Sequence, residues 1–160
     1  MAKSQSHRAT VIGLISDTHG LLRPEALAAL AGVERIIHAG DIGGPEILDS
    51  LLHIAPVAAV RGNNDKGPWA RAVPLTTTLQ VGGVSIHVLH DVKELDLDPV
   101  AAGLQVVVAG HSHKPTVAQQ DGVLYVNPGS AGPRRFSLPI AVGFLEIAAG
   151  AVNARILKIL

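Results

Sequence analysis

The stretch Ser16-Asp17-Thr18-His19-Gly20 follows an apolar run at residues 11–15, and it sets the expectation for the whole chain. An acid and a histidine stand two positions apart where a strand is expected to end. Side chains two apart in an extended chain point the same way, so Asp17 and His19 can reach one ion together. Taken alone, the pair is more typical of a turn acid beside a solvent-facing histidine. The decision depends on whether other predicted strands also end in ligand-type residues.

Apolar runs alternate with amphipathic segments in the first part of the chain. Strands are expected at 9–16, 33–39 and 56–60, and helices at 24–31 and from 43 to about 53. Pro24 suits the first turn of a helix, and Gly32 ends that helix. The order strand, helix, strand, helix, strand predicts a parallel sheet with crossover helices.

The second half is rich in predicted strands. Residues 66–73 are expected to form a loop, 75–81 and 84–89 a hairpin around Gly82-Gly83, and 99–102 a short helix. Further strands are expected at 105–109, 116–119, 123–126, 140–147 and 152–159. Two sheets packed face to face with helices outside would account for this order. We expect one domain over residues 1–160, in which 1–8 are a frayed terminus with an idle His7.

Composition excludes several classes of function. The chain has 160 residues, of which 48% are hydrophobic, so it can bury a globular core. A net charge of zero leaves no broad basic surface for nucleic acid, and four aromatic residues leave no base-stacking platform. The absence of cysteine excludes disulfides and thiolate metal sites, and is typical of a cytoplasmic protein. No run approaches the ~20 apolar residues of a membrane span.

Five predicted strands end in potential metal ligands. In chain order these are Asp17 with His19, Asp41, Asn63, His90, and His111 with His113. Sites in open α/β sheets lie at the carboxyl ends of strands, so we expect the seven residues to meet at one rim. Oxygen and imidazole donors suit Mn, Fe, Zn or Co. Seven ligands exceed one tetrahedral site, so two ions are expected, which is the arrangement that phosphoryl hydrolysis uses.

Glycine precedes three of these ligands, at Gly40, Gly62 and Gly110. Glycine permits a sharp exit from a strand and a close approach of the backbone to a ligand. The repeated pairing argues against scattered polar residues.

These motifs, in this order, resemble those of the metallophosphoesterase (calcineurin-like) superfamily. They are Asp17-x-His19, Gly40-Asp41, Gly62-Asn63-x-Asp65, His90 and Gly110-His111-x-His113. The short length and Asn127-Pro128-Gly129-Ser130 resemble its small prokaryotic phosphodiesterase branch, which also contains the metal-poor retromer subunit of the same fold. The resemblance covers residues 11 to about 147.

The resemblance implies a four-layer α/β/β/α sandwich with two mixed sheets and a dimetal site. It assigns Asp17, His19, Asp41 and His113 to one metal, and Asp41, Asn63, His90 and His111 to the other, with Asp41 bridging. A metal-bridging hydroxide would attack phosphorus. Manganese is the expected metal, with Fe, Zn, Co and Ni as alternatives.

Two positions depart from the family pattern. Asn64 stands where the wider superfamily has a histidine that is thought to protonate the leaving group, and an amide cannot act as a general acid. The leaving group would then depart with help from water or metal, or be intrinsically good. Asp91 follows His90 where the family usually has glycine, so it either orients that ligand or reshapes the loop.

Other polar residues have structural alternatives. His38, His87, Asp65 and Asn127 are expected to be structural, His53 to lie on a helix surface, and Arg134 and Arg135 to be solvated. Arg61 and Asn64 are candidate substrate contacts, although a salt-bridged Arg61 is an equal alternative.

The leading hypothesis is a metal-dependent phosphodiesterase that acts on a small phosphate ester. A non-catalytic interaction module of the same fold and a phosphomonoesterase remain as alternatives. We expect neither a nucleic-acid surface nor a membrane partner, and a homo-oligomer is left open.

Overall fold

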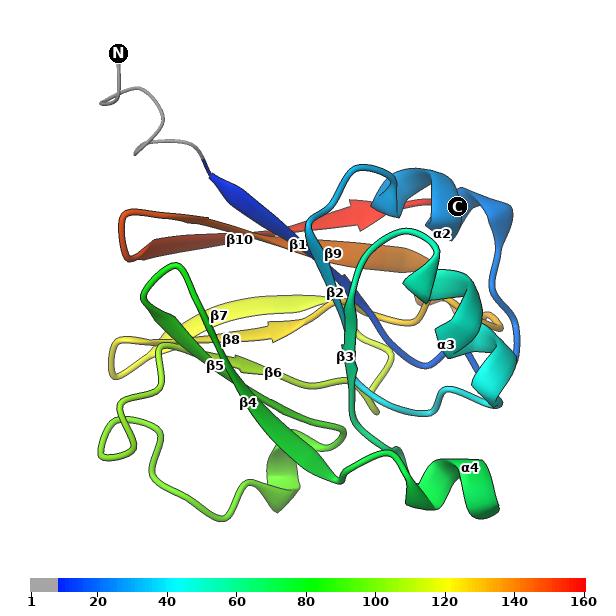
Figure 1. Ribbon diagram of the computed structural model, residues 1–160, viewed down its shortest axis with the longest axis horizontal. Coiled ribbons are helices and arrows are strands. Elements are labelled where there is room, and N and C mark those ends of the chain that lie inside the picture. The colour runs from blue at the N-terminus through cyan, green and yellow to red at the C-terminus, as the bar shows by residue number, and fades with distance from the viewer. Residues whose placement is uncertain (1–8) are drawn as a thin grey trace.

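Two five-stranded sheets packed face to face form the centre of the computed structural model, which describes residues 9–160 (Figure 1). The first sheet has the order β10-β9-β1-β2-β3, formed by Thr10–Ile15 (β1), Arg35–His38 (β2), Val57–Ala59 (β3), Ala141–Ala148 (β9) and Ala151–Lys158 (β10). The second has the order β4-β5-β6-β8-β7, formed by Thr76–Val81 (β4), Val84–Leu89 (β5), Val106–Val108 (β6), Thr116–Gln120 (β7) and Val123–Asn127 (β8). The frayed terminus expected at residues 1–8, with His7, lies outside the described residues.

Both sheets are mixed, as predicted. β1, β2 and β3 run parallel, while β9 is antiparallel to β1 and β10 to β9. In the second sheet β5, β6 and β8 run parallel, and β4 and β7 flank them as antiparallel edge strands. The parallel strands therefore end on the same side within each sheet.

An aliphatic core fills the space between the sheets. Ile12 and Leu14 of β1 are fully buried, because alternate side chains of a strand point to the same face. They belong to one cluster with Ile86 and Val88 of β5. Burying each such side chain contributes about 1.5–3 kcal/mol, so this layer stabilises the sandwich without aromatic residues.

The α-helices of residues 9–160 lie on the outer face of the first sheet. Pro24–Leu30 (α2) and Pro45–Leu52 (α3) begin at proline and bury Leu30 and Leu51 in a second cluster on the outer face of that sheet (Figure 1). A short helix, Pro68–Arg71 (α4), carries the half-buried Trp69, which packs against the same cluster.

The outer face of the second sheet is covered differently. A 3₁₀ turn at Val92–Glu94 (η1) and the loop around it replace an α-helix there. Leu95 of this loop packs against a small cluster that includes Leu89 and Val107. The fourth layer of the sandwich is thus mostly irregular chain.

Two predicted segments are wrong in detail. Residues 66–73 contain α4 rather than only a loop, and residues 99–102 form turns rather than a helix. Asp98 Oδ1 accepts from the Val100 N–H at 3.1 Å, and Gly103 adopts a φ of 74°, so the chain reverses after one turn.

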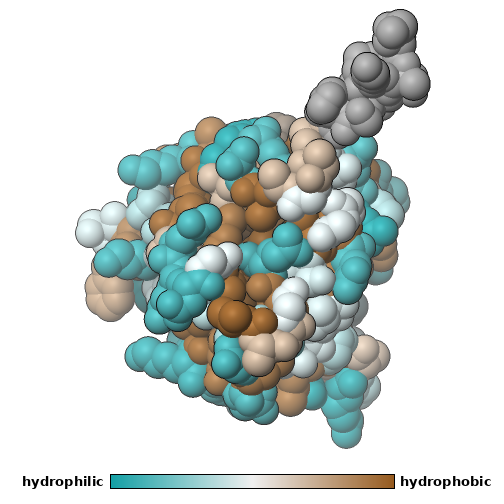
Figure 2. Space-filling view, turned by 90° about the vertical axis from the view of Figure 1, so that its left-hand side faces the viewer, coloured by the Kyte–Doolittle hydropathy of each residue, from teal (hydrophilic) through white to brown (hydrophobic). Residues whose placement is uncertain are grey.

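The two ends of the sandwich differ. The turns of the β4–β5, β7–β8 and β9–β10 hairpins gather at one end in Figure 1, and Figure 2 shows this end with hydrophobic surface along its middle. The carboxyl ends of β1, β2, β5 and β6 lie at the other end. None of the helices in residues 9–160 is both long and apolar enough to cross a membrane.

Candidate metal centre

Backbone hydrogen bonds join the loops that carry the predicted ligands. Asp17 N donates to Gly40 O at 2.9 Å, and His19 N donates to Asp41 O at 2.9 Å, which joins the loops after β1 and β2. Gly110 N donates to His90 O at 2.9 Å and joins the loops after β5 and β6. Main-chain hydrogen bonds therefore hold these loops in pairs at the edge of the sheets where the predicted ligands lie.

Left-handed backbone conformations concentrate at these loops. Of the eight described non-glycine residues with positive φ, five are predicted ligands: Asp17 (55°), His19 (47°), Asp41 (55°), His111 (70°) and His113 (64°). Such conformations are uncommon for non-glycine residues and persist where the surroundings impose them. Their clustering indicates that these loops are shaped to aim side chains.

Asp17 directs its two carboxylate oxygens to different partners. Oδ2 accepts hydrogen bonds from Ser16 Oγ at 2.7 Å and from the His111 backbone N–H at 3.1 Å. Oδ1 is buried and has no hydrogen-bond partner. The protein thus holds one oxygen and leaves the other free for an ion.

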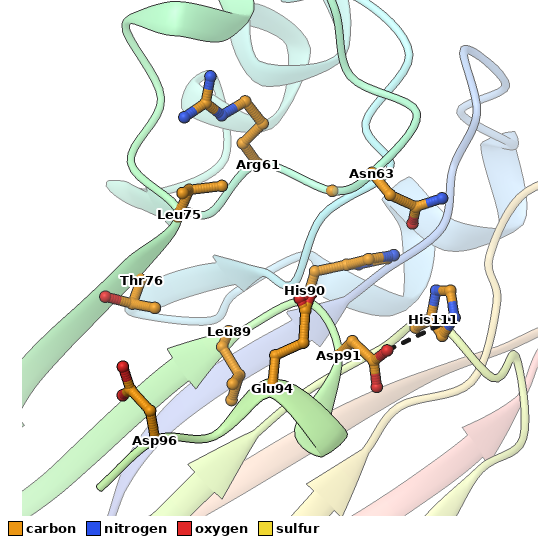
Figure 3. Close-up of a pocket in the computed structure, with 11 residues that line it drawn as sticks. Arg61, Asn63, Leu75, Thr76, Leu89, His90, Asp91, Glu94, Asp96 and His111 are labelled. Carbon is orange, nitrogen blue, oxygen red and sulfur yellow. Dashed lines mark ion pairs between the residues drawn. The ribbon is translucent and has the colours of Figure 1, made fainter.

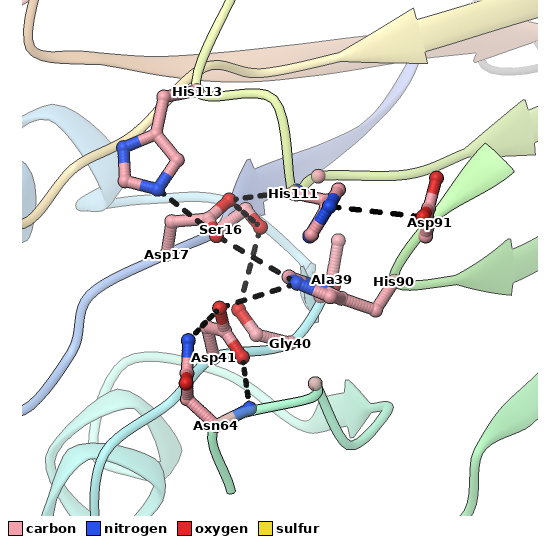
Figure 4. Close-up of polar contacts among 12 residues, drawn as sticks. Ser16, Asp17, Ala39, Gly40, Asp41, Asn64, His90, Asp91, His111 and His113 are labelled. Carbon is pink, nitrogen blue, oxygen red and sulfur yellow. Dashed lines mark hydrogen bonds and ion pairs between the residues drawn. The ribbon is translucent and has the colours of Figure 1, made fainter. Parts of the chain in front are cut away.

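Three histidine nitrogens surround the free oxygen of Asp17, and Figure 4 shows two of these residues, His90 and His113. The Nε2 atoms of His113, His19 and His90 lie 3.4, 3.8 and 3.9 Å from Asp17 Oδ1. The Nε2 atoms of His19 and His90 are buried and also lack hydrogen-bond partners. Buried polar atoms are rarely left unpaired, so this cluster has the character of a cation site.

Asp41 adds a second carboxylate to the same cluster. Its Oδ2 lies 3.3 Å from His90 Nε2 and 3.7 Å from His19 Nε2. Asn64 donates to it twice, from its backbone N–H to Oδ1 at 2.9 Å and from its side-chain amide to Oδ2 at 3.0 Å. The Asn64 amide therefore holds Asp41 in place, and a contact of Asn64 with substrate stays a prediction.

Two overlapping groups of residues can each hold an ion. One comprises Asp17, His19 and His113, and the other Asp17, Asp41 and His90, with the ligand atoms of each group within 4.8 Å of one another. The shared residue is Asp17, whereas the family resemblance gives Asp41 that role. Because Asp41 also approaches His19, either carboxylate can lie between two ions.

The two acids of this cluster have lowered pKa values, and His90 has a raised pKa. Burial would raise the pKa of Asp17, but its contacts with His113 and Ser16 and the charge of His90 outweigh it and hold that pKa below its ordinary value. Burial also works against the low pKa of Asp41, which results from contacts with His90 and Asn64. Burial would lower the pKa of His90, yet Asp41 and the Ala39 carbonyl raise it. Two carboxylates thus stay ionised and attract a positive charge.

His90 is well oriented despite the unusual residue after it. Its Nδ1 lies 2.7 Å from the Ala39 carbonyl oxygen, which leaves Nε2 facing the two carboxylates. Asp91 does not orient His90. Its Oδ2 lies 3.7 Å from His111 Nε2 instead, and its Oδ1 accepts from the Lys93 N–H.

His111 and Asn63 lie at the open side of the cluster. The His111 ring packs edge-on against His90 with centroids 5.2 Å apart, and its side chain is 45% exposed. Asn63 is exposed and borders a cavity together with Arg61, His90 and His111 (Figure 3). His111 lies outside the two groups of acids and histidines, and Asn63 is an amide that such groups do not include, so the role of both residues as ligands stays a prediction.

Close backbone approach explains two of the glycines. A Cβ on Gly62 would fall on Asp41 Oδ1, and a Cβ on Gly110 would fall on Ser16 Oγ and lie 2.7 Å from Asp17 Oδ2. These glycines let the loops after β3 and β6 touch the two acids.

The residues that were expected to be structural hold the loops. Asp65 accepts from the backbone N–H groups of Ile42, Gly43 and Gly62 at 2.9–3.1 Å. Asn127 donates from its amide to Gly110 O at 2.9 Å and to Ser112 Oγ at 3.0 Å.

His38 is buried, and its Nδ1 accepts from the Gly40 N–H at 3.1 Å. The Nε2–H therefore faces Thr18 Oγ1 at 3.0 Å. These contacts confirm the structural interpretation of His38.

Sequence reasoning missed Ser16 and Ser130. Ser16 Oγ donates to Asp17 Oδ2, and Ser130 Oγ donates to the Asp17 carbonyl at 3.0 Å. Ser16 adjoins the ligand, so its position was a usable signal. Ser130 lies 113 positions from Asp17 in the chain, so local spacing could not indicate this contact.

Comparisons with known proteins agree with this geometry. Residues 11–150 match the calcineurin-like phosphoesterase superfamily domain. A probable metallophosphoesterase of Methanothermobacter thermautotrophicus is 32% identical over 160 residues, which covers 92% of each chain. A phosphodiesterase of Methanocaldococcus jannaschii is 26% identical and covers 84% of this chain and 92% of its own.

A solved structure shares the fold at lower identity. Vacuolar Protein Sorting 29 from Cryptosporidium parvum superposes with a TM-score of 0.77 at 20% identity, covering 94% of this chain and 98% of that one. At this identity the likeness concerns the fold alone.

Proposed function

Because this chain belongs to the calcineurin-like phosphoesterase superfamily, we propose that it is a metal-dependent phosphoesterase that prefers phosphodiesters. The relative from Methanocaldococcus jannaschii that is named a phosphodiesterase supports the diester preference. The cavity beside the cluster measures about 320 Å³, which is enough for one arm of a small ester.

One observation carries this proposal. The unpaired Oδ1 of Asp17 faces three histidine Nε2 atoms within 3.9 Å, and Asp41 Oδ2 lies beside two of them. Asp, His and Asn side chains are the ligands of divalent Mn, Fe, Zn and Co, and the chain offers no thiolate. Two such ions would activate water and neutralise phosphate charge.

The remaining side chains have roles that follow from their positions. Asp17, His19 and His113 would hold one ion, Asp41 and His90 would hold the other, and Asn63 and His111 would complete the open side. Arg61 borders the cavity, and its buried Nε has no hydrogen-bond partner, so its guanidinium would bind a phosphate oxygen.

The chain has an amide where a general acid would stand. Asn64 donates to both oxygens of Asp41 and supplies no proton to a leaving group. We therefore expect rates to depend strongly on the leaving group, with nitrophenolate far better than an alkoxide.

The test is hydrolysis of bis-p-nitrophenyl phosphate after the protein is stripped with EDTA and reloaded with Mn²⁺. Wild-type protein should release nitrophenolate, and Asp41→Ala should reduce the rate by at least ~10³-fold, because removal of a ligand dismantles the site. Asp49→Ala, on the exposed side of α3, is the matched control and should retain the rate. Metal analysis should give two ions per chain.

A non-catalytic interaction module of the same fold is the second candidate, because the fold shared with Vacuolar Protein Sorting 29 does not by itself imply an activity. Absence of hydrolysis with Mn, Fe, Zn, Co or Ni, in protein that binds these ions, would support this module. Comparing p-nitrophenyl phosphate with the diester separates a phosphomonoesterase from a phosphodiesterase.

A further inference from the structure

A cavity borders the ionic cluster, which is the group of Asp17, Asp41, His19, His90 and His113. The walls of this cavity carry opposite charges (Figure 3). Arg61 lies on one wall, while Asp91, Glu94 and Asp96 line the other. Leu75 and Leu89 provide the apolar part of the lining. A ligand that enters this space therefore meets three carboxylates and one guanidinium besides the imidazoles.

The acidic wall is not neutralised from within the protein. In residues 9–160, Glu94 and Asp96 form no ion pair, and the charged partner of Asp91 is His111 at 3.7 Å, besides the Lys93 backbone N–H from which its Oδ1 accepts. The nearest cation along the chain, Lys93, is exposed and does not line the cavity. The carboxylates are available to a charged group in the cavity.

A second feature connects this cavity to the ionic cluster. His90 lines the cavity and is only 6% exposed, while its Nε2, which has no hydrogen-bond partner, faces the carboxylates of Asp17 and Asp41. The cavity thus opens directly onto the ionic cluster, so an ester whose phosphorus lies at the cluster places one of its arms in the cavity.

We infer that this site selects phosphodiesters with a short cationic arm, such as an aminoalkyl group. The inference rests on the proposed function and specifies its substrate class. The phosphate would lie towards Arg61 and the cluster, the alkyl chain against Leu75 and Leu89, and the ammonium towards Glu94 and Asp96. An ammonium group offers three N–H donors, which suits a wall of carboxylates.

The same wall disfavours a second negative charge. An arm that ends in a carboxylate or a further phosphate would approach Glu94 and Asp96 with no neutralising partner. Glu94 and Asp96 are exposed, and an ion pair at an exposed site changes kcat/KM by only about 1.5–5-fold, so an arm that meets both acids should show a preference of about 3–10-fold per charge change. It should weaken at high salt, because exposed charges are screened over about 8–10 Å.

The experiment compares three p-nitrophenyl phosphodiesters whose other arm is 3-aminopropyl, propyl or 2-carboxyethyl. In each case water attacks phosphorus, the phosphorus–aryloxy bond breaks, and nitrophenolate leaves with the bonding electrons, so only the arm differs. For the Mn²⁺-loaded protein, kcat/KM should fall in the order aminopropyl, propyl, carboxyethyl. The ratio of the first to the last should be at least ~10-fold.

Two variants locate the origin of the preference. Glu94→Gln with Asp96→Asn should bring the ratio of aminopropyl to carboxyethyl esters close to one. The control, Glu25→Gln with Asp49→Asn, removes two exposed acids from α2 and α3 and should keep the wild-type ratio.

Equal kcat/KM values for the three esters would overturn the inference. A preference that persists unchanged in the Glu94/Asp96 variant would also overturn it. Either result would leave the phosphoesterase proposal intact. Absence of hydrolysis with all three esters would count against the phosphoesterase proposal. In that case calorimetric titration of the metal-loaded protein with the same esters decides, and equal affinities would overturn the arm preference.

Discussion

At the residue scale, Asp17 and His90 each use one polar atom for a contact within the protein and leave a second atom free for an ion. Asp17 uses Oδ2 for Ser16 and the His111 backbone, and leaves Oδ1 to the histidines. His90 uses Nδ1 for the Ala39 carbonyl and leaves Nε2 for the carboxylates. Each side chain is therefore oriented before an ion arrives, which reduces the ordering cost of binding.

Gly62→Ala should damage the site without unfolding the protein. The new Cβ would fall on Asp41 Oδ1 and on the Asp41 backbone nitrogen, so this acid must move. We expect at least ~10-fold weaker Mn²⁺ binding by calorimetry, as for other changes that displace a ligand.

Gly122→Ala is the control for a loss of stability without damage to the site. Gly122 has a φ of 80° in the β7–β8 turn, and its added Cβ would meet nothing within 4 Å. This variant should lose about 1–2 kcal/mol of stability and keep its metal affinity. Wild-type affinity in Gly62→Ala would show that Asp41 does not bind the ion.

His38 should make the metal-free protein sensitive to acid. Burial lowers its pKa to about 4 from an ordinary 6.5, so the folded state keeps it neutral while the unfolded chain takes up a proton. This part of the stability is present above pH 6.5 and is lost as pH falls towards 4. Between pH 7 and pH 5 it amounts to about 2 kcal/mol.

The measurement is urea unfolding in EDTA at both pH values. His38→Asn keeps an acceptor for the Gly40 N–H but cannot titrate, so it should lose about 2 kcal/mol less than the wild type on acidification. His53→Asn, at the exposed end of α3, serves as the control. Equal acid sensitivity in all three proteins would mean that His38 is already charged when folded.

At the scale of elements, strand ends carry the candidate ligands, and other strands hold the loops in which these residues lie. Asn127 closes β8, and its amide grips the loop after β6 through Gly110 and Ser112. This loop carries His111 and His113, so its shape depends on a strand that provides no ligand itself.

Asn127→Ala should therefore weaken metal binding from a distance. Loss of the two hydrogen bonds frees the 110–113 loop, and we expect Mn²⁺ affinity to fall by about 10-fold. Asn153→Ala, the same change on the exposed face of β10, should leave affinity unchanged. Equal effects of the two substitutions in a calorimetric titration would rule out this role for Asn127.

Elements with a clear period could be predicted, and those set by tertiary contacts could not. Continuous apolar runs predicted the buried strands β1 to β3, and the segments between them that begin at Pro24 and Pro45 predicted α2 and α3. α4 has only four residues, Pro68–Arg71, too few to show a period. The helix expected at 99–102 failed because Asp98 and Gly103 form a turn.

The site was likewise predictable in part. The positions of five residues after strand ends predicted that their side chains would meet, namely Asp17, His19, Asp41, His90 and His113. It could not indicate which ring nitrogen faces inward, nor that Asp91 approaches His111 rather than orienting His90. Those details depend on side-chain packing between loops that lie far apart in the chain.

At the scale of the whole molecule, ion binding and folding are linked. The cluster unites loops from both sheets, so an ion that binds only the folded state must stabilise the entire sandwich. At a free concentration 100 times its Kd, Mn²⁺ should add about 2.7 kcal/mol, or roughly 5–10 °C in Tm.

Thermal unfolding with and without Mn²⁺ checks this expectation, and EDTA should reverse the shift. The double variant Asp17→Asn, Asp41→Asn removes both carboxylate charges and should show no shift. A Tm that rises equally in this variant would place the bound ion elsewhere on the surface.

The lone indole of the chain has a practical consequence. Trp69 sits in α4 immediately after the loop that carries Asn63, and the remaining aromatic residues are Tyr125, Phe136 and Phe144. Emission excited at 295 nm therefore originates from this one corner of the fold. The natural protein, without any dye, should report spectroscopically how that loop responds when ions or esters arrive.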